Sequence, residues 1–177
     1  MLLTIGIFAY NLDIKDRKQK SSIEPITSKS KMKITSAAFE NNQTIPAKYT
    51  CDGDNVNPEL NFSDIPTNTK SLILIVDDPD APSGTWTHWI VWNISSSTTK
   101  IKENTTPSGS QEGTTSFGKP GYGGPCPPSG THHYFFKLYA LDTILSLDSK
   151  ADVKQLNQAM QRHVLTETEL IGLYSRK

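Results

Sequence analysis

The chain has 177 residues, enough for one domain that buries about 70% of the surface its extended form would expose. Its 18 lysine and arginine residues balance 18 aspartate and glutamate residues, so no net charge draws the protein to nucleic acid or to an anionic membrane. The two cysteines are too few for a disulfide-stapled mini-protein and lack the CxxC spacing of a zinc ribbon, although one bridge can form in an oxidising compartment.

The N-terminal part of the sequence predicts a tail. Residues 2–10 are apolar but far shorter than the roughly 20 residues of a membrane span, and they lack the basic start of a signal peptide. Residues 11–31 are polar, which is typical of a solvated segment. We expect a tail over residues 1–31, a domain over residues 32–177 and no integral membrane segment. A cytoplasmic location is favoured, and export is the alternative if residues 2–10 are a shortened signal.

The first part of the domain predicts short strands separated by turn residues. Residues 33–39 predict a first strand, and residues 50–58 predict a polar loop whose acidic side chains lack the ligand spacing of an EF-hand. Residues 72–76 (LILIV) form a continuous apolar run of strand length. Such a run is typical of a strand that is buried on both faces.

Two later segments alternate in the manner of half-buried strands, over residues 86–94 and 132–141. Between them lie a polar connection over residues 95–118 and a loop over residues 119–130 that glycine and proline make rigid. The alternation predicts that the following residues share one face of their strand: Trp86, His88, Ile90 and Trp92 in the first, and His132, Tyr134, Phe136 and Leu138 in the second.

The C-terminal part predicts a helix and then a last strand. Ser149 is expected to cap a helix that runs to Gln161, and residues 166–174 are expected to return to extended structure. One helix among at least five strands predicts a mainly β fold with antiparallel pairing. The helix is predicted from a single apolar stripe formed by Val153, Leu156, Met160 and Val164.

Polar side chains gather where three predicted strands begin or end. Residues 78–82 (Asp-Pro-Asp-Ala-Pro) follow the buried strand, and His88 lies near the start of the next one. His132 and Tyr134 begin the strand after the glycine-proline loop. Imidazoles, a phenol and loop N–H groups are donors suited to a phosphate or another oxyanion. If these strands are neighbours, the sequence predicts a small polar pocket.

The acid in this group sets a condition on the ligand. A carboxylate that faces a phosphate is repelled by it, so Asp78 is expected to face a histidine, a backbone N–H group or an amine. This arrangement suits a zwitterionic head group. We expect anion affinity to rise as pH falls through the histidine range, because imidazolium binds anions better than imidazole does.

Two enzymatic alternatives remain open at this stage. Cys126 could act as a nucleophile activated by a pocket histidine, as in a thiol hydrolase, although a structural thiol or a bridge to Cys51 competes with this role. A metal-binding enzyme is the other alternative, but the spacing of the ligands lacks the specificity of a known metal motif. Its four ligands would be Asp78, Asp80, His88 and His132.

Three ordered motifs resemble those of the phosphatidylethanolamine-binding proteins. They are residues 78–82 (DPDAP), residues 86–93 (WTHWIVWN), and residues 124–130 (GPCPPSG) with the following His132 and Tyr134. The sequence is most similar to the bacterial and archaeal branch called Raf kinase inhibitor-like or YbhB/YbcL, over residues 32–174. The spacer between Pro82 and His88 is shorter than in eukaryotic members, and the C-terminal helix of mammalian members is missing, which argues against lipid-tail binding and kinase-directed inhibition.

The resemblance implies a Greek-key antiparallel β-sheet core with one or two peripheral helices. It implies a non-enzymatic protein without a cofactor, whose partner is a small anionic or zwitterionic ligand such as phosphate or a phosphoethanolamine-like group. Regulation of a kinase or protease, an unidentified protein partner and a homodimer stay open. The residues expected to bind the ligand are Asp78, Asp80, Ala81, Pro82, Trp86, His88, Gly124, Pro128, His132 and Tyr134.

Overall fold

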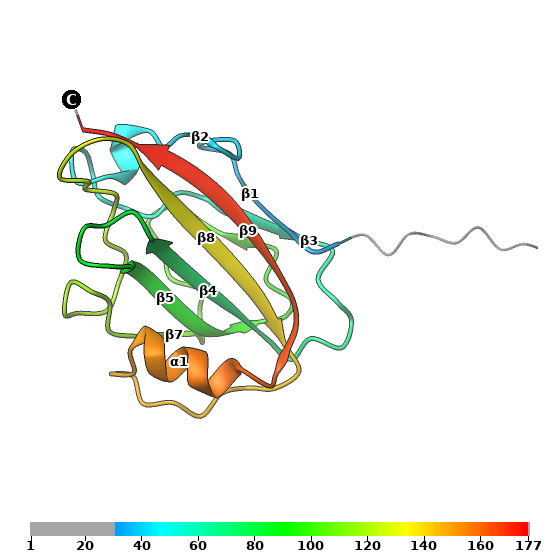
Figure 1. Cartoon of the computed structure of the whole chain (residues 1–177). Helices are drawn as coiled ribbons and strands as arrows, with labels where there is room; N and C mark the ends of the chain where they lie inside the picture. The colour runs from blue at the N-terminus through cyan, green and yellow to red at the C-terminus, as the bar shows by residue number, and fades with distance from the viewer. Residues whose placement is uncertain (1–30, 177) are drawn as a thin grey trace, which may run out of the picture.

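The computed structural model describes residues 31–176 as two β-sheets and one α-helix (Figure 1). The smaller sheet has the order β1-β3-β6, with β1 at Lys33–Ser36, β3 at Leu60–Ser63 and β6 at Lys100–Ile101. The larger sheet has the order β2-β9-β8-β4-β5-β7, with β2 at Gln43–Thr44, β9 at Val164–Tyr174, β8 at His132–Leu141, β4 at Ser71–Asp78, β5 at Trp86–Ser95 and β7 at Gln111–Glu112.

The pairing confirms the predicted fold class. All neighbouring strands run antiparallel except β2 and β9, which pair in parallel at Gln43 and Thr44. A short 3₁₀ helix at Ala47–Tyr49 precedes the predicted loop, and the first strand ends at Ser36 rather than at the expected Phe39. The predictions for residues 1–30 lie outside the described residues.

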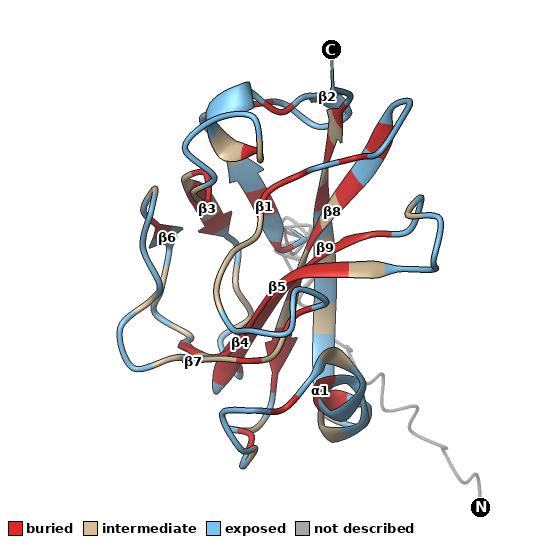
Figure 2. Ribbon diagram, turned by 90° about the vertical axis from the view of Figure 1, so that its left-hand side faces the viewer, coloured by how far each residue is buried: buried red, intermediate tan, exposed pale blue. Residues whose placement is uncertain are grey.

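Strand β4 explains the apolar run that the sequence shows. Leu72, Leu74 and Val76 point into a core between the two sheets, whereas Ile73 and Ile75 point into a second core beneath α1 (Val153–Met160). Figure 2 shows α1 on one side of the larger sheet and strands β1, β3 and β6 on the other. A strand covered on both faces needs apolar residues at every position, which β4 supplies up to residue 76.

The helix begins later than predicted. Asp152, not Ser149, is its N-cap: the Asp152 side chain accepts the Gln155 N–H at 2.9 Å, and the Gln155 side chain accepts the Asp152 N–H at 3.1 Å. This reciprocal pair satisfies two donors at the helix start. The predicted stripe packs on the sheet through Leu156 and Met160, but Val164 lies in β9 and is exposed.

The sequence predicted that Trp86, His88, Ile90 and Trp92 share one face of β5, and this prediction is wrong for Ile90 and Trp92. Trp89 lies opposite Val76 and Thr87 lies opposite Asp77, so His88 is an extra residue in the ladder, as in a β-bulge. Beyond the bulge, Ile90 and Trp92 pack in the core beneath α1 rather than on the face that carries His88. The bulge turns His88 toward β8, where the site lies.

Candidate ligand-binding site

Asp78 and His132 form a buried pair at the ends of two neighbouring strands. Because alternation continues along β4, Asp78 lies on the face of the core between the sheets, which is also the face of His132 on β8. The Asp78 carboxylate accepts the His132 Nδ1–H at 2.7 Å and the backbone N–H of Asp80 at 2.9 Å. The two residues are 3% and 7% exposed, respectively. The pair therefore fixes the orientation of the His132 ring and leaves Nε2 as the nitrogen that is available to a ligand.

His88 is held in the same way by a different acceptor. Its Nδ1 lies 2.6 Å from the carbonyl oxygen of Gly123, which can only accept, so Nδ1 carries the proton and Nε2 is left for the pocket. Burial lowers the pKa of His88 below its ordinary value, although the Gly123 carbonyl and the nearby Asp78 charge oppose this shift. Burial therefore favours the neutral imidazole of His88 when no ligand is bound.

Tyr134 lies between the two imidazoles. Its ring centroid is 5.2 Å from that of His88 in an edge arrangement and 6.5 Å from that of His132 in a stacked one. The side chain is fully buried, and its hydroxyl has no hydrogen-bond partner of ordinary geometry. Burial and the Asp78 charge raise the pKa of this phenol well above its ordinary value. Tyr134 therefore stays protonated and packs against both histidines without lining the pocket.

A pocket of about 440 Å³ opens beside the two histidines. Its polar lining is Asp78, His88 and His132, and the remainder is mainly apolar. The Phe117 ring makes edge contacts of 5.5 Å with both Trp86 and His88 at the rim. The pocket thus combines two imidazoles with a largely apolar wall, which is made of Ala81, Pro82, Ser83, Trp86, Phe117, Cys126 and Pro128.

Three predicted residues support the pocket without lining it: Tyr134, Asp80 and Gly124. Asp80 turns away to the surface, where its carboxylate accepts the backbone N–H of His133 at 2.9 Å and lies 2.7 Å from His133 Nδ1. These hydrogen bonds lower the pKa of Asp80. Gly124 is buried, and a Cβ on it would lie 2.5 Å from the carbonyl oxygen of Tyr49. Its missing side chain therefore allows two loops to pack together.

The predicted ligand-binding residues omitted three lining residues, Ser83, Phe117 and Cys126, of which Cys126 was considered only as a nucleophile. Phe117 lies in the predicted polar connection and is exposed. Ser116 fixes this connection to β5: its N–H donates to the Thr87 carbonyl at 3.0 Å, and its hydroxyl accepts the Thr87 N–H at 2.9 Å. One aromatic residue in a polar segment gives no signal of such contacts. The only available hint was that long loops in compact domains are often functional.

The structure overturns the thiol alternative. Cys126 is bonded to Cys51, and both cysteines of the chain are accounted for by this bridge. Residues 31–176 also contain no group of three histidine, cysteine or acidic side chains placed to hold one metal ion. The four suggested metal ligands are separated because Asp80 turns to His133 and Tyr134 lies between the histidines.

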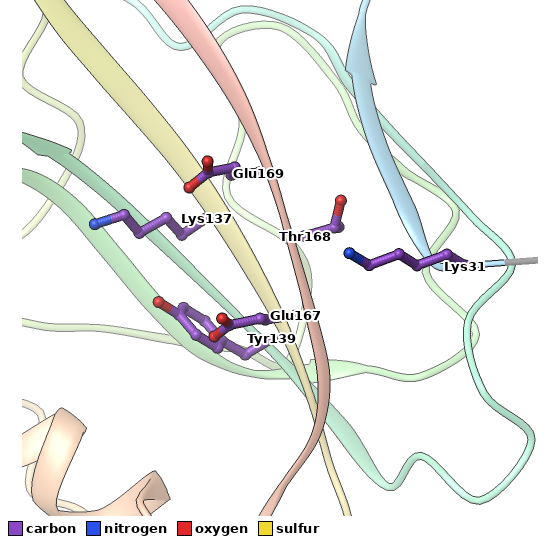
Figure 3. A pocket seen from close by; sticks show the side chains of 6 residues that line it. All are labelled: Lys31, Lys137, Tyr139, Glu167, Thr168 and Glu169. Atoms are coloured by element: carbon purple, nitrogen blue, oxygen red, sulfur yellow. The ribbon is translucent and has the colours of Figure 1, made fainter.

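A second hollow lies at the edge of β9, with Thr168 and Lys31 on one side of this strand and the other lining residues on the side that faces α1 (Figure 3). Lys137 Nζ lies 2.9 Å from the carboxylate of Asp77. Burial raises the pKa of Asp77, and the hydrogen bond and charge of Lys137 oppose this rise. Figure 3 shows Glu167 and Glu169 on the same side of β9 as Lys137. None of the predicted ligand-binding residues lines this hollow, which is formed by Lys31, Lys137, Tyr139, Glu167, Thr168 and Glu169.

The fold and the first pocket define a class of mainly β proteins with a small acid and imidazole cavity at one end of a sheet. The family model for phosphatidylethanolamine-binding proteins matches residues 35–175. The chain belongs to the phosphatidylethanolamine-binding protein family, as the three motifs predicted.

Relatives and solved structures agree with this assignment. The chain is 49% identical over 150 residues to a UPF0098 protein of Methanothermobacter thermautotrophicus, which covers 82% of this chain and 99% of the relative. A phosphatidylethanolamine-binding protein homologue from Chlamydia trachomatis, CT736, is similar with a TM-score of 0.80 and 41% identity over 83% of this chain and 99% of its own. Escherichia coli YbcL, described as a new member of the mammalian family, has a TM-score of 0.79 and 30% identity over 84% of this chain and 100% of its own.

Proposed function

We propose that this member of the family binds a small phosphorylated or other anionic group in the pocket at His88 and His132. One observation carries the proposal. Each imidazole has its Nδ1 engaged by a buried acceptor, so that both rings offer Nε2 to the same cavity. When protonated, two such nitrogens donate to an oxyanion.

The wall of the pocket favours a zwitterionic ligand such as a phosphoethanolamine-like group. Each oxygen of the Asp78 carboxylate accepts one hydrogen bond, from the Asp80 N–H and from His132, so the acid is already engaged by the protein. The rings of Trp86 and Phe117 at the rim offer faces to which an ammonium group is attracted. The phosphate is thus assigned to the histidines and the amine to the aromatic rim.

Ligand-induced stabilisation of the wild type and of His132→Ala tests this function. A ligand at a hundredfold excess over its Kd adds about 2.7 kcal/mol to the free energy of unfolding, which a thermal-shift assay resolves. We expect phosphate or phosphoethanolamine to stabilise the wild type and to lose most of this effect in His132→Ala. His163→Ala is the matched control, because His163 pairs with Asp142 outside the pocket. An equal response of both variants would refute the pocket assignment.

A protein partner, regulation of a kinase or protease, and a homodimer remain predictions from the sequence resemblance. The pocket itself provides no argument for any of them, because its residues identify no protein partner. We therefore propose ligand binding as the function and assign no partner surface.

We propose export in place of the cytoplasmic location that the sequence favoured. No helix in residues 31–176 is long and apolar enough to cross a membrane. Disulfides persist in oxidising compartments and are rare in the cytosol outside hyperthermophiles, so the Cys51–Cys126 bridge supports export. Rapid acid quenching of cells followed by alkylation is expected to leave both cysteines unlabelled, whereas labelled cysteines would support the cytoplasmic location.

A further inference from the structure

The disulfide forms part of the pocket wall, and its two sulfur atoms are not equivalent. Cys126 lines the pocket and is exposed, whereas Cys51 is partly buried on the other loop and does not line it. Pro125 and Pro127 flank Cys126 and restrict the backbone that presents it. A nucleophile that enters the pocket therefore meets the sulfur of Cys126 before that of Cys51.

Hydrogen bonds hold the two loops together independently of the bridge. The Cys51 N–H donates to the Pro125 carbonyl at 3.1 Å, and the Gly124 N–H donates to the Asn55 side chain at 2.7 Å. The loops are also joined by the Tyr122 hydroxyl, which donates to the Tyr49 carbonyl at 2.9 Å. The S–S bond can therefore open while these contacts keep the pocket wall in place.

We infer that the pocket is a site of thiol–disulfide exchange, in which a small anionic thiol forms a mixed disulfide with Cys126. The thiolate attacks the Cys126 sulfur, a new S–S bond forms, and the bond to Cys51 breaks. Cys51 leaves as a thiolate and takes a proton from water, so the entering thiol is oxidised and Cys51 is reduced. The attack at Cys126 follows from the wall geometry, and the preference for an anionic thiol rests on the proposed function.

Exchange and anion binding exclude each other, because the group attached to Cys126 occupies the same cavity of about 440 Å³. A bound anion thus protects the bridge, and an attached thiol blocks the anion. An imidazolium about 4 Å away attracts an anionic thiol even at the dielectric constant of water. This attraction corresponds to a rate of exchange roughly fivefold higher than that of a neutral thiol.

The experiment treats the oxidised full chain at about pH 6, where imidazolium is more populated than at neutral pH, with 2-mercaptoethanesulfonate or with neutral 2-mercaptoethanol. Rates are compared at equal thiolate concentration, free thiols are trapped with N-ethylmaleimide, and the modified peptides are identified by mass spectrometry. We expect the mixed disulfide on Cys126 and the maleimide on Cys51. The sulfonate is expected to react roughly fivefold faster, and excess sulfate should remove this advantage. His163→Ala should keep the preference for the sulfonate, and His132→Ala should lose it.

Mixed disulfide found mainly on Cys51, or a sulfonate rate that sulfate leaves unchanged, would overturn the inference. Thermal stabilisation by sulfate, measured on the same samples, separates this outcome from failure of the proposed function. If sulfate stabilises the protein but does not slow the sulfonate, the pocket binds anions and the exchange inference is wrong. If sulfate neither stabilises the protein nor slows the reaction, both the proposed function and the anionic preference are wrong.

Discussion

Removing the Cys51–Cys126 bridge is expected to lower the free energy of unfolding by about 4.5 kcal/mol, according to the loop-closure relation for disulfides. The bridge joins residues that are 75 positions apart, so its loss releases a long loop in the unfolded chain. In the folded state the cost is small, because the hydrogen bonds between the loops of Cys51 and Cys126 remain. The destabilisation therefore arises mainly in the unfolded state.

Equilibrium unfolding in urea of the double variant Cys51→Ala/Cys126→Ala, compared with the oxidised wild type, measures this effect. Because the bridge mainly constrains the unfolded chain, folding should slow much more than unfolding accelerates, provided that the two loops meet early in folding. Ser129→Ala, an exposed change in the same loop, is the control and should alter stability by less than about 0.5 kcal/mol. A loss of less than about 1 kcal/mol in the double variant would show that the unfolded chain is compact without the bridge.

The sequence was sufficient to predict the layers of the fold. The apolar run in β4 indicated a strand covered on both faces, and its alternation separates Asp77, which pairs with Lys137, from Asp78, which pairs with His132. A single alternating pattern thus distinguishes a structural acid from one in the site. The predicted convergence of Asp78, His88 and His132 on one pocket agrees with the structure.

The rest of the site depends on contacts between distant segments, which no local pattern contains. His88 reaches the pocket through a bulge, and a bulge depends on how β5 pairs with β4 rather than on β5 alone. Asp80 was assigned to the pocket with Asp78, but His133 binds it from another strand. For the same reason, counting two cysteines left their pairing open until the loops were placed side by side.

The affinity of the pocket for sulfate is expected to rise as pH falls, by up to tenfold per pH unit for each proton taken up on binding. Sulfate is a suitable probe, because its charge does not change over this range and the protein alone titrates. Neutral His88 presents an Nε2 lone pair that repels an oxyanion, because its proton lies on the Nδ1 facing Gly123. Protonation converts this nitrogen into a donor, so binding requires proton uptake wherever free His88 is neutral.

The direction of the pKa shift gives the pH window. Burial lowers the pKa of free His88 below 6.5, so the empty protein loses stability as pH falls from the ordinary histidine value toward this lowered one. Bound sulfate favours the imidazolium and raises the pKa of His88. The affinity for sulfate therefore increases as pH falls toward the pKa of free His88, and it levels off below that pKa. Calorimetric titrations from about pH 8 to about pH 5.5, in buffers of different ionisation enthalpy, measure the protons taken up. His88→Gln should reduce the uptake, because an amide donates at every pH, and a flat wild-type curve would contradict the role given to the histidines.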